Sequence, residues 1–292
     1  LIIGGAIIYW VSSLGDIVLP VIGPVATWQM VFFIVGLPGI VLSLMIFTVP
    51  EPARRGQSKA LAADRPWYAV YLDLIKFIKT HPRFFFSHYT GFTVCAIAVT
   101  GCVSWYPVHM IRTFGWGEGR IGLFLGMTIM AAGIVGKLAC GWFVDRMYRR
   151  GYRDAQLRWY SCCLLLATPA GIIATTSANP WVFLTMIGIF IVLNTSMSAC
   201  AMSALNLVTP NQLRGAGVAL FTTLVALVGG SAGTILIPMA SQLLFDGDGA
   251  IGRGMATVIG ITCPLGALAL ASGLKAMRNA MAEAEGGRPA LR

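Results

Sequence analysis

Long apolar runs separated by short polar segments make up most of this chain. Seven runs of roughly 20 residues cover positions 30–49, 85–107, 121–144, 159–176, 181–208, 215–240 and 253–274. Each is long enough to cross about 30 Å of hydrocarbon as an α-helix. Residues 1–11 are apolar but too few to span, so we expect them to end an eighth helix that starts before the first residue. The pattern predicts an all-α, polytopic helical membrane protein with about eight transmembrane helices.

Composition excludes the main alternatives to a membrane protein. Hydrophobic residues make up 57% of the 292 positions and charged residues only 11%, whereas about a quarter of a soluble domain is charged. One globular core cannot hide so much apolar surface, which excludes a soluble enzyme, a disordered chain and a collagen-like chain. The 7 cysteines all lie in apolar runs. We expect them to pack as small apolar side chains and not to form disulfides.

The basic residues indicate an orientation in the membrane. The net charge is +10, which on a soluble protein would suggest a nucleic-acid partner. Here the basic residues lie between the apolar runs. If segment 51–83 is inside, the inner loops and tail hold 17 Lys and Arg residues and the outer loops hold 3. The positive-inside rule then predicts that the linker and the C-terminus are cytoplasmic. We expect a protein of the bacterial inner membrane, with no nucleic-acid partner.

The longest polar stretch divides the chain. We expect the last two helices of an N-terminal half in 1–50, a cytoplasmic linker in 51–83, a six-helix half in 84–276 and a cytoplasmic tail in 277–292. The linker ends in an amphipathic pattern, with Tyr71, Leu74 and Ile78 on one face and Asp73 and Lys76 on the other. This pattern predicts a helix on the inner membrane surface, and a partner-binding helix is the alternative.

Three segments carry a resemblance to a known family. Residues 141–150 have the pattern G-x-x-x-D-R-x-x-R-R, which resembles the loop signature repeated in each half of Major Facilitator Superfamily transporters. Residues 28–54, ending in E-P-x-R, resemble the sixth helix of Spinster-like and anion:cation-symporter-like members, although Gln29 stands where many members carry Arg. Residues 209–220 contain P-x-x-x-R-G and resemble the segment that opens their eleventh helix.

The resemblance implies an N-terminally truncated chain, the C-terminal two-thirds of a twelve-helix fold. The function that it implies is secondary active transport of a small organic solute, anionic or lipid-like, by alternating access. It implies a monomer in membrane lipid, a coupling ion (proton or sodium), no cofactor and no enzymatic activity. A membrane sensor or scaffold that does not transport, built on the same helices, is the alternative.

The signature loop suggests a conformational latch. A carboxylate beside arginines at a helix end can form charge-assisted bonds and face the positive end of a neighbouring helix. The alternative is that the charges only keep the loop inside. The candidate gating residues are Gly141, Asp145, Arg146, Arg149, Arg150 and Arg214.

Polar side chains inside the spans are candidates for a solute cavity. Lys137 is the one charged residue well inside a span, on a face shared with Gly133 and Gly141. It either binds an anion or extends its ammonium to the interface. The stripe with Asn194, Ser196, Ser203 and Asn206 either contacts solute or forms interhelical hydrogen bonds. Tyr106, beside Trp105, either anchors at the outer interface or lines the cavity.

The sequence suggests no catalytic or metal centre. The three histidines have no metal-ligand spacing, and all 11 carboxylates fall outside the apolar runs. Gly117, Gly119 and Gly122 match a dinucleotide-binding pattern, but they follow no strand and open a membrane helix. We therefore expect no metal, no cofactor and no enzyme.

Overall fold

The computed structural model describes residues 7, 10–11, 17–19, 23–48, 50, 66, 68–247 and 249–286. It divides into two compact units. The first holds Leu1–Gln57 and Gly117–Met127, and the second holds Ser58–Trp116 and Thr128–Arg292.

The first unit contains a short β-hairpin followed by a membrane-length helix. Strand β1 (Ile17–Leu19) pairs antiparallel with β2 (Gly23–Val25), with Ile17 opposite Val25. Helix α2 (Thr27–Met45) follows and ends in the 3-10 turn η1 (Ile46–Thr48). The helix is apolar on all sides, as a membrane span is. The all-α class holds with the hairpin as a small addition, and the eighth helix expected in residues 1–11 lies mostly outside the described residues.

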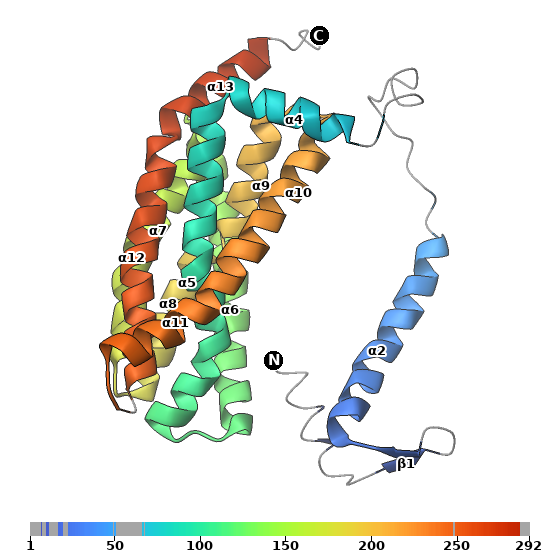
Figure 1. Cartoon of the computed structure of the whole chain (residues 1–292), viewed down its shortest axis with the longest axis vertical. Coiled ribbons are helices and arrows are strands. Elements are labelled where there is room, and N and C mark those ends of the chain that lie inside the picture. The colour runs from blue at the N-terminus through green and yellow to red at the C-terminus, as the bar shows by residue number, and fades with distance from the viewer. Residues whose placement is uncertain are drawn as a thin grey trace. The chain divides into compact units, whose positions relative to one another are not determined.

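The second unit is a helical bundle (Figure 1). Helix α6 belongs to it from Thr128 onward. Its elements are α4 (Ala69–Thr80), α5 (Pro82–Phe114), α6 (Glu118–Arg149), α7 (Ala155–Thr176), α8 (Pro180–Asn194), α9 (Met197–Val208), α10 (Arg214–Leu224), the π-helical turn η2 (Val225–Gly230), α11 (Ser231–Leu244), α12 (Ala250–Ser272) and α13 (Leu274–Gly286). Within the described residues, seven helical stretches are long and apolar enough to cross a membrane. This confirms the predicted class of polytopic helical membrane protein.

Close helix packing in the bundle depends on small residues. Helix α12 packs against α5, α7 and α11, and α5 also packs against α11 and η2. At the α5–α11 crossing, a Cβ placed on Gly101 would lie 2.6 Å from the carbonyl oxygen of Gly233. Only glycines allow the two backbones to approach so closely. Gly229 and Gly233 thus form a packing face of η2 and α11 against α5.

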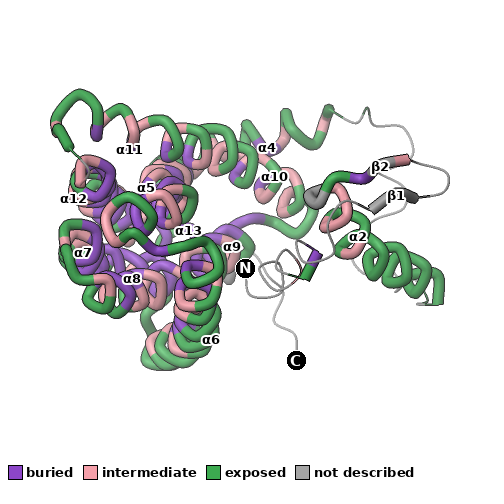
Figure 2. Tube along the Cα trace, turned by 90° about the horizontal axis from the view of Figure 1, so that it is seen from below, coloured by how far each residue is buried: buried purple, intermediate pink, exposed green. Residues whose placement is uncertain are grey.

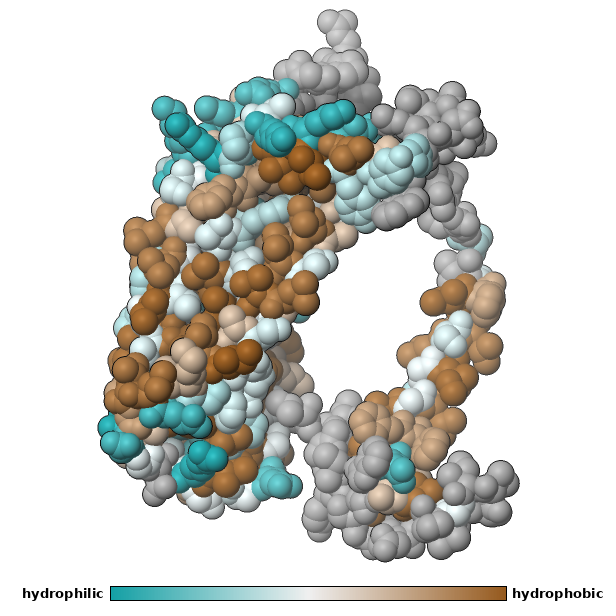
Figure 3. All heavy atoms as spheres, in the orientation of Figure 1, coloured by the Kyte–Doolittle hydropathy of each residue, from teal (hydrophilic) through white to brown (hydrophobic). Residues whose placement is uncertain are grey.

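The outside of the bundle is apolar between two polar ends. Buried residues face the neighbouring helices, whereas the outward faces of α6, α7 and α8 are largely exposed (Figure 2). The space-filling view shows hydrophobic side chains over the middle of the bundle and hydrophilic ones at its ends (Figure 3). Exposed leucines such as Leu138, Leu166 and Leu268 would be unfavourable in water, so this surface fits lipid.

Two helices lie at one end of the bundle, which we call the basic end (Arg83, Arg214, Lys275 and Arg278). Helix α4 falls where the amphipathic pattern predicted a helix, and it lies across this end near α10 (Figure 1). Helix α13 occupies the segment expected to be the tail. It forms because Met277, Ala280 and Met281 make an apolar stripe at helical spacing, and all three are buried.

Candidate functional site

Two membrane spans of the bundle are interrupted near their middle. The span Pro180–Val208 leaves the regular α-helical pattern for two residues, between α8, which ends at Asn194, and α9, which begins at Met197. Thr195 and Ser196 keep right-handed helical backbone angles there. The span Arg214–Leu244 contains the π-helical turn Val225–Gly230. Each span was predicted as one helix, because hydropathy is continuous across residues 225–230 and the polar residues from position 194 onward were interpreted as a stripe on one helix. Broken spans and π-turns at mid-depth are typical of solute sites in transporters.

Asn194 and Ser196 stabilise the first interruption. The buried Asn194 accepts a hydrogen bond from the Tyr160 hydroxyl at 3.2 Å through Oδ1. Its Nδ2 donates to the carbonyl oxygen of Phe190 at 2.9 Å. Ser196 is also buried, and its Oγ donates to the carbonyl oxygen of Leu193 at 3.0 Å. These bonds link α7 to the break and satisfy polar groups that a membrane interior would leave unpaired.

Gly136, the residue before Lys137, contacts the same interruption. A Cβ on Gly136 would collide with the carbonyl oxygen of Val192 and the side chain of Thr195, so α6 touches the break through a glycine. Lys137 itself is exposed. A Cβ added to either of its stripe partners, Gly133 and Gly141, would meet no atom within 4 Å, so their face of α6 is open.

The remaining predicted cavity residues lie in different surroundings. Ser203 is half-buried, and its Oγ accepts a hydrogen bond from Nε2 of Gln156 at 3.3 Å, whereas Asn206 is exposed. Tyr106 is fully buried and packs edge-to-face on Phe183, with ring centroids 5.9 Å apart. The helix that carries it, α5, continues through Pro107 as far as Phe114, and the role of Tyr106 stays a prediction.

The predicted gating residues occupy the basic end. Asp145, Arg146 and Arg149 lie in the last turns of α6, and Arg150 follows it. The Arg146 guanidinium lies 5.6 Å from the centre of the Trp142 ring. Arg214 begins α10 and donates from Nε to the carbonyl oxygen of Thr209 at 3.1 Å. Asp145 is exposed and forms no ion pair with any residue that the structure describes. Its latch role stays a prediction.

A buried ion-pair cluster at this end, which was not predicted from the sequence, is formed by Asp154, Arg158 and Arg278. Asp154 precedes α7 and is fully buried. Its Oδ2 accepts from Arg158 at 3.0 Å and from Arg278 of α13 at 2.5 Å. The spacing of four residues between Asp154 and Arg158 is a visible signal for one pair. Nothing in the sequence pointed to Arg278, which lies 124 residues away.

These features define the chain as a polytopic helical membrane protein with two interrupted spans. Residues 3–234 match the family model of the Major Facilitator Superfamily. The chain therefore belongs to this superfamily, which confirms the predicted family.

The similar proteins include transporters, and this chain matches only part of each. An "MFS-type efflux pump" of Mycolicibacterium smegmatis (strain ATCC 700084 / mc(2)155) is 26% identical over 245 residues, covering 82% of this chain and 55% of the pump. A bacterial homologue of the human lysosomal transporter Spinster, inward-facing and unoccupied, matches with a TM-score of 0.63 and 18% identity, over 96% of this chain and 65% of that one. Its inward-facing, occupied form matches with a TM-score of 0.56 and 17% identity, over 99% and 66%. At these identities the likeness shows the fold alone, and the Spinster-like branch stays a prediction.

Proposed function

We propose that the protein containing this chain is a secondary active transporter that moves a small organic solute across a bacterial inner membrane by alternating access. The pair of mid-depth interruptions, at 195–196 and 225–230, is the observation that carries the proposal. Irregular turns within a span change the backbone hydrogen-bond pattern locally, and such turns are frequent at functional sites. Family membership and the relatives' printed names support the same class.

The proposed solute is anionic or lipid-like and enters near the α8–α9 break. Lys137 supplies the positive charge, because it is a cation on an open face of α6 next to the residue that contacts the break. Ser203 and Asn206 continue the polar stripe along α9 toward the basic end. Asn194, Ser196 and Tyr106 support the wall from inside the bundle, since they are buried.

The proposed gate is the end of α6. In our proposal Asp145 and its neighbouring arginines hold one conformation through charged contacts and release it when the helices rock. Arg214 at the start of α10 plays the corresponding part at the other interrupted span. The basic end faces the cytoplasm, by the positive-inside rule.

Transport by the complete protein in proteoliposomes tests this function. The probes are a radiolabelled long-chain organic anion and its uncharged methyl ester, each assayed with a proton gradient, a sodium gradient or no gradient. We expect saturable, gradient-dependent movement of the anion in excess of the ester. Movement equal to that in protein-free liposomes for both probes under all three conditions would refute the proposed solute class.

A further inference from the structure

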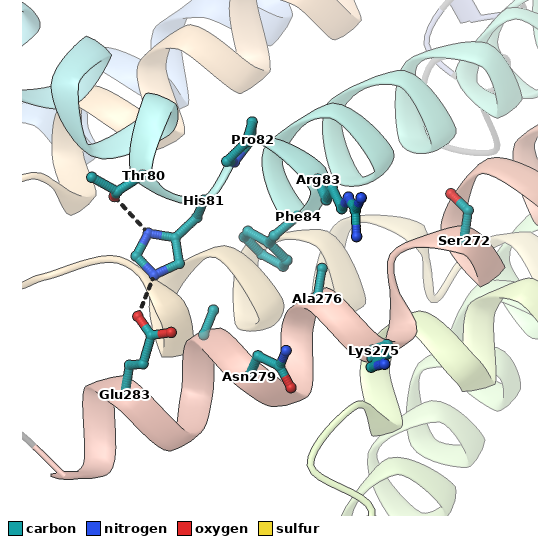
Figure 4. A pocket seen from close by; sticks show the side chains of 11 residues that line it. Thr80, His81, Pro82, Arg83, Phe84, Ser272, Lys275, Ala276, Asn279 and Glu283 are labelled. Carbon is teal, nitrogen blue, oxygen red and sulfur yellow. Dashed lines mark hydrogen bonds and ion pairs between the residues drawn. The ribbon is translucent and has the colours of Figure 1, made fainter.

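A cavity at the basic end lies where α4, α5, α12 and α13 meet. It has a volume of about 460 Å³, a size at which small molecules bind. In Figure 4, Arg83 of α5 approaches the cavity from one side, and Lys275 and Asn279 of α13 approach it from the other. Ser272, at the end of α12, also lines it. The cavity is thus formed by residues that are distant in sequence.

One arginine and one lysine in this cavity carry positive charges that no carboxylate among the described residues neutralises. Arg83 and Lys275 are exposed, and neither forms an ion pair or hydrogen bond with any residue that the structure describes. The one lining carboxylate, on Glu283, is already bonded to Nε2 of His81 at 3.0 Å. The other ring nitrogen of His81, Nδ1, is hydrogen-bonded to Oγ1 of Thr80 at 2.8 Å. The cavity therefore presents positive charge, which favours an anion as its ligand.

The surroundings of the cavity fit a membrane surface. Helix α4, which leads into it, exposes Tyr71, Leu72 and Ile75, as expected for a helix lying in the headgroup layer. On α12, Leu268 and Leu265 precede Ser272 by four and seven residues, and both are more than half exposed. By helical periodicity they form an apolar stripe that runs from the cavity into the membrane-spanning part.

We propose that this cavity binds the phosphate group of an anionic membrane phospholipid. Arg83 and Lys275 contact the phosphate from opposite sides, while Asn279 and Ser272 offer hydrogen bonds to the glycerol part. The acyl chains lie along Leu268 and Leu265. Basic pockets between membrane helices recognise anionic headgroups in this way. The site is separate from the α8–α9 break, so this inference goes beyond the proposed transport function.

A soluble phosphate compound carries the same chemistry, but the structure favours the lipid. A soluble anion would use the two cations and leave the stripe of Leu265 and Leu268 without a role. A lipid uses both, because its charged head and its apolar chains match the two neighbouring surfaces.

Native mass spectrometry of the purified 292-residue chain in detergent micelles tests the proposal. The chain is titrated with dioleoyl phosphatidylglycerol, with dioleoyl phosphatidylcholine, and with glycerol phosphate as the soluble probe. We expect one phosphatidylglycerol to bind tightly. The double variant Arg83→Gln/Lys275→Gln should bind it about tenfold more weakly, because two headgroup contacts are lost. Both residues are exposed and unpaired among the described residues, and unchanged helical circular dichroism confirms that the variant folds.

A matched control separates the cavity from general surface charge. Lys76→Gln/Lys79→Gln removes two cations from α4 outside the cavity, and we expect binding within twofold of the unaltered chain. An equal loss in both double variants would overturn the site, as would equal affinity for phosphatidylcholine. Glycerol phosphate binding as tight as phosphatidylglycerol would overturn the lipid assignment. The variant Leu265→Ala/Leu268→Ala should reduce the affinity for phosphatidylglycerol several-fold. An unchanged affinity in this variant would also overturn the lipid assignment.

Discussion

Removal of the buried charge of Asp154 should destabilise the bundle more than any other single charge removal at the basic end. Asp154→Asn keeps the shape of the side chain but replaces two charge-assisted bonds, to Arg158 and Arg278, with neutral ones. Breaking a buried ion pair costs about 3–5 kcal/mol when the partner charge stays buried. Here the two arginine side chains are 37% and 45% exposed and can regain water. We therefore expect a loss of about 3 kcal/mol, at the low end of that range.

Reversible unfolding in mixed micelles of a mild detergent and sodium dodecyl sulfate measures this free energy. Hydrogen exchange adds a local readout, because Arg278 is the charged link from α13 to the start of α7. In Asp154→Asn the amides of Leu274–Gly286 should exchange faster, while those of α5 should change little. Arg278→Gln should reproduce the faster exchange of α13 at a smaller cost, about 1.5 kcal/mol, since Asp154 keeps Arg158.

Asp145→Asn is the matched control, because it removes a carboxylate from the same end that is exposed and has no ion pair among the described residues. It should change the unfolding free energy by less than about 0.5 kcal/mol. The reasoning fails if Asp154→Asn unfolds within about 0.5 kcal/mol of the unaltered chain, or if the control costs as much as the test.

Three further predictions concern the wall of the proposed solute cavity, the proposed gate at the end of α6, and the glycine packing between α5 and α11. In the complete transporter, Lys137→Ala should weaken binding of a long-chain organic anion by about 2–5 kcal/mol and Lys137→Arg should weaken it less; unaltered affinity in Lys137→Met, measured by equilibrium binding, would leave only the interfacial role. Asp145→Asn should alter turnover in proteoliposomes yet keep affinity within a few-fold, and a hundredfold loss of affinity would place Asp145 in the solute site instead. Gly233→Ala should cost about 1–3 kcal/mol by overpacking the α5–α11 crossing, whereas Gly133→Ala, facing open space, should not destabilise the chain; equal unfolding curves would contradict this.

Hydropathy predicted the spans well because lipid imposes one requirement on every outward side chain. The run at 121–144 corresponds to α6, which is a few residues longer at both ends. The run at 159–176 corresponds to α7, which begins earlier, at Ala155, and ends at the predicted residue, Thr176. Helix ends extended further where polar side chains belong to the interface, as at Glu118 and Arg149. Hydropathy reports only whether a residue suits lipid. The exact ends of the helices also depend on capping and packing, which hydropathy does not measure.

The site was harder to predict because its features depend on contacts between distant segments. Asn194 was identified as a polar residue inside a span, but the polar residues at 194–198 fit one face of a continuous helix as well as they fit an irregular turn. For Tyr106 an interfacial and a cavity position were both left open, and its burial against Phe183 depends on a contact with α8 that the sequence does not show. Asp154 looked like an ordinary loop carboxylate, since its partner Arg278 comes from the other end of the bundle's sequence.

The π-helical turn Val225–Gly230 also affects how this chain should be compared with its relatives. A π-turn holds one more residue than the α-helical turn it replaces, and each residue advances an α-helix by about 100°. A relative whose corresponding helix is regular throughout would need a one-residue gap within this turn. Without that gap, every position from Ser231 to Leu244 would be matched to a neighbour on the wrong face, and Gly233 would lose its correspondence with the crossing point of α5. Homology inferences along α11 therefore depend on where the extra residue is placed.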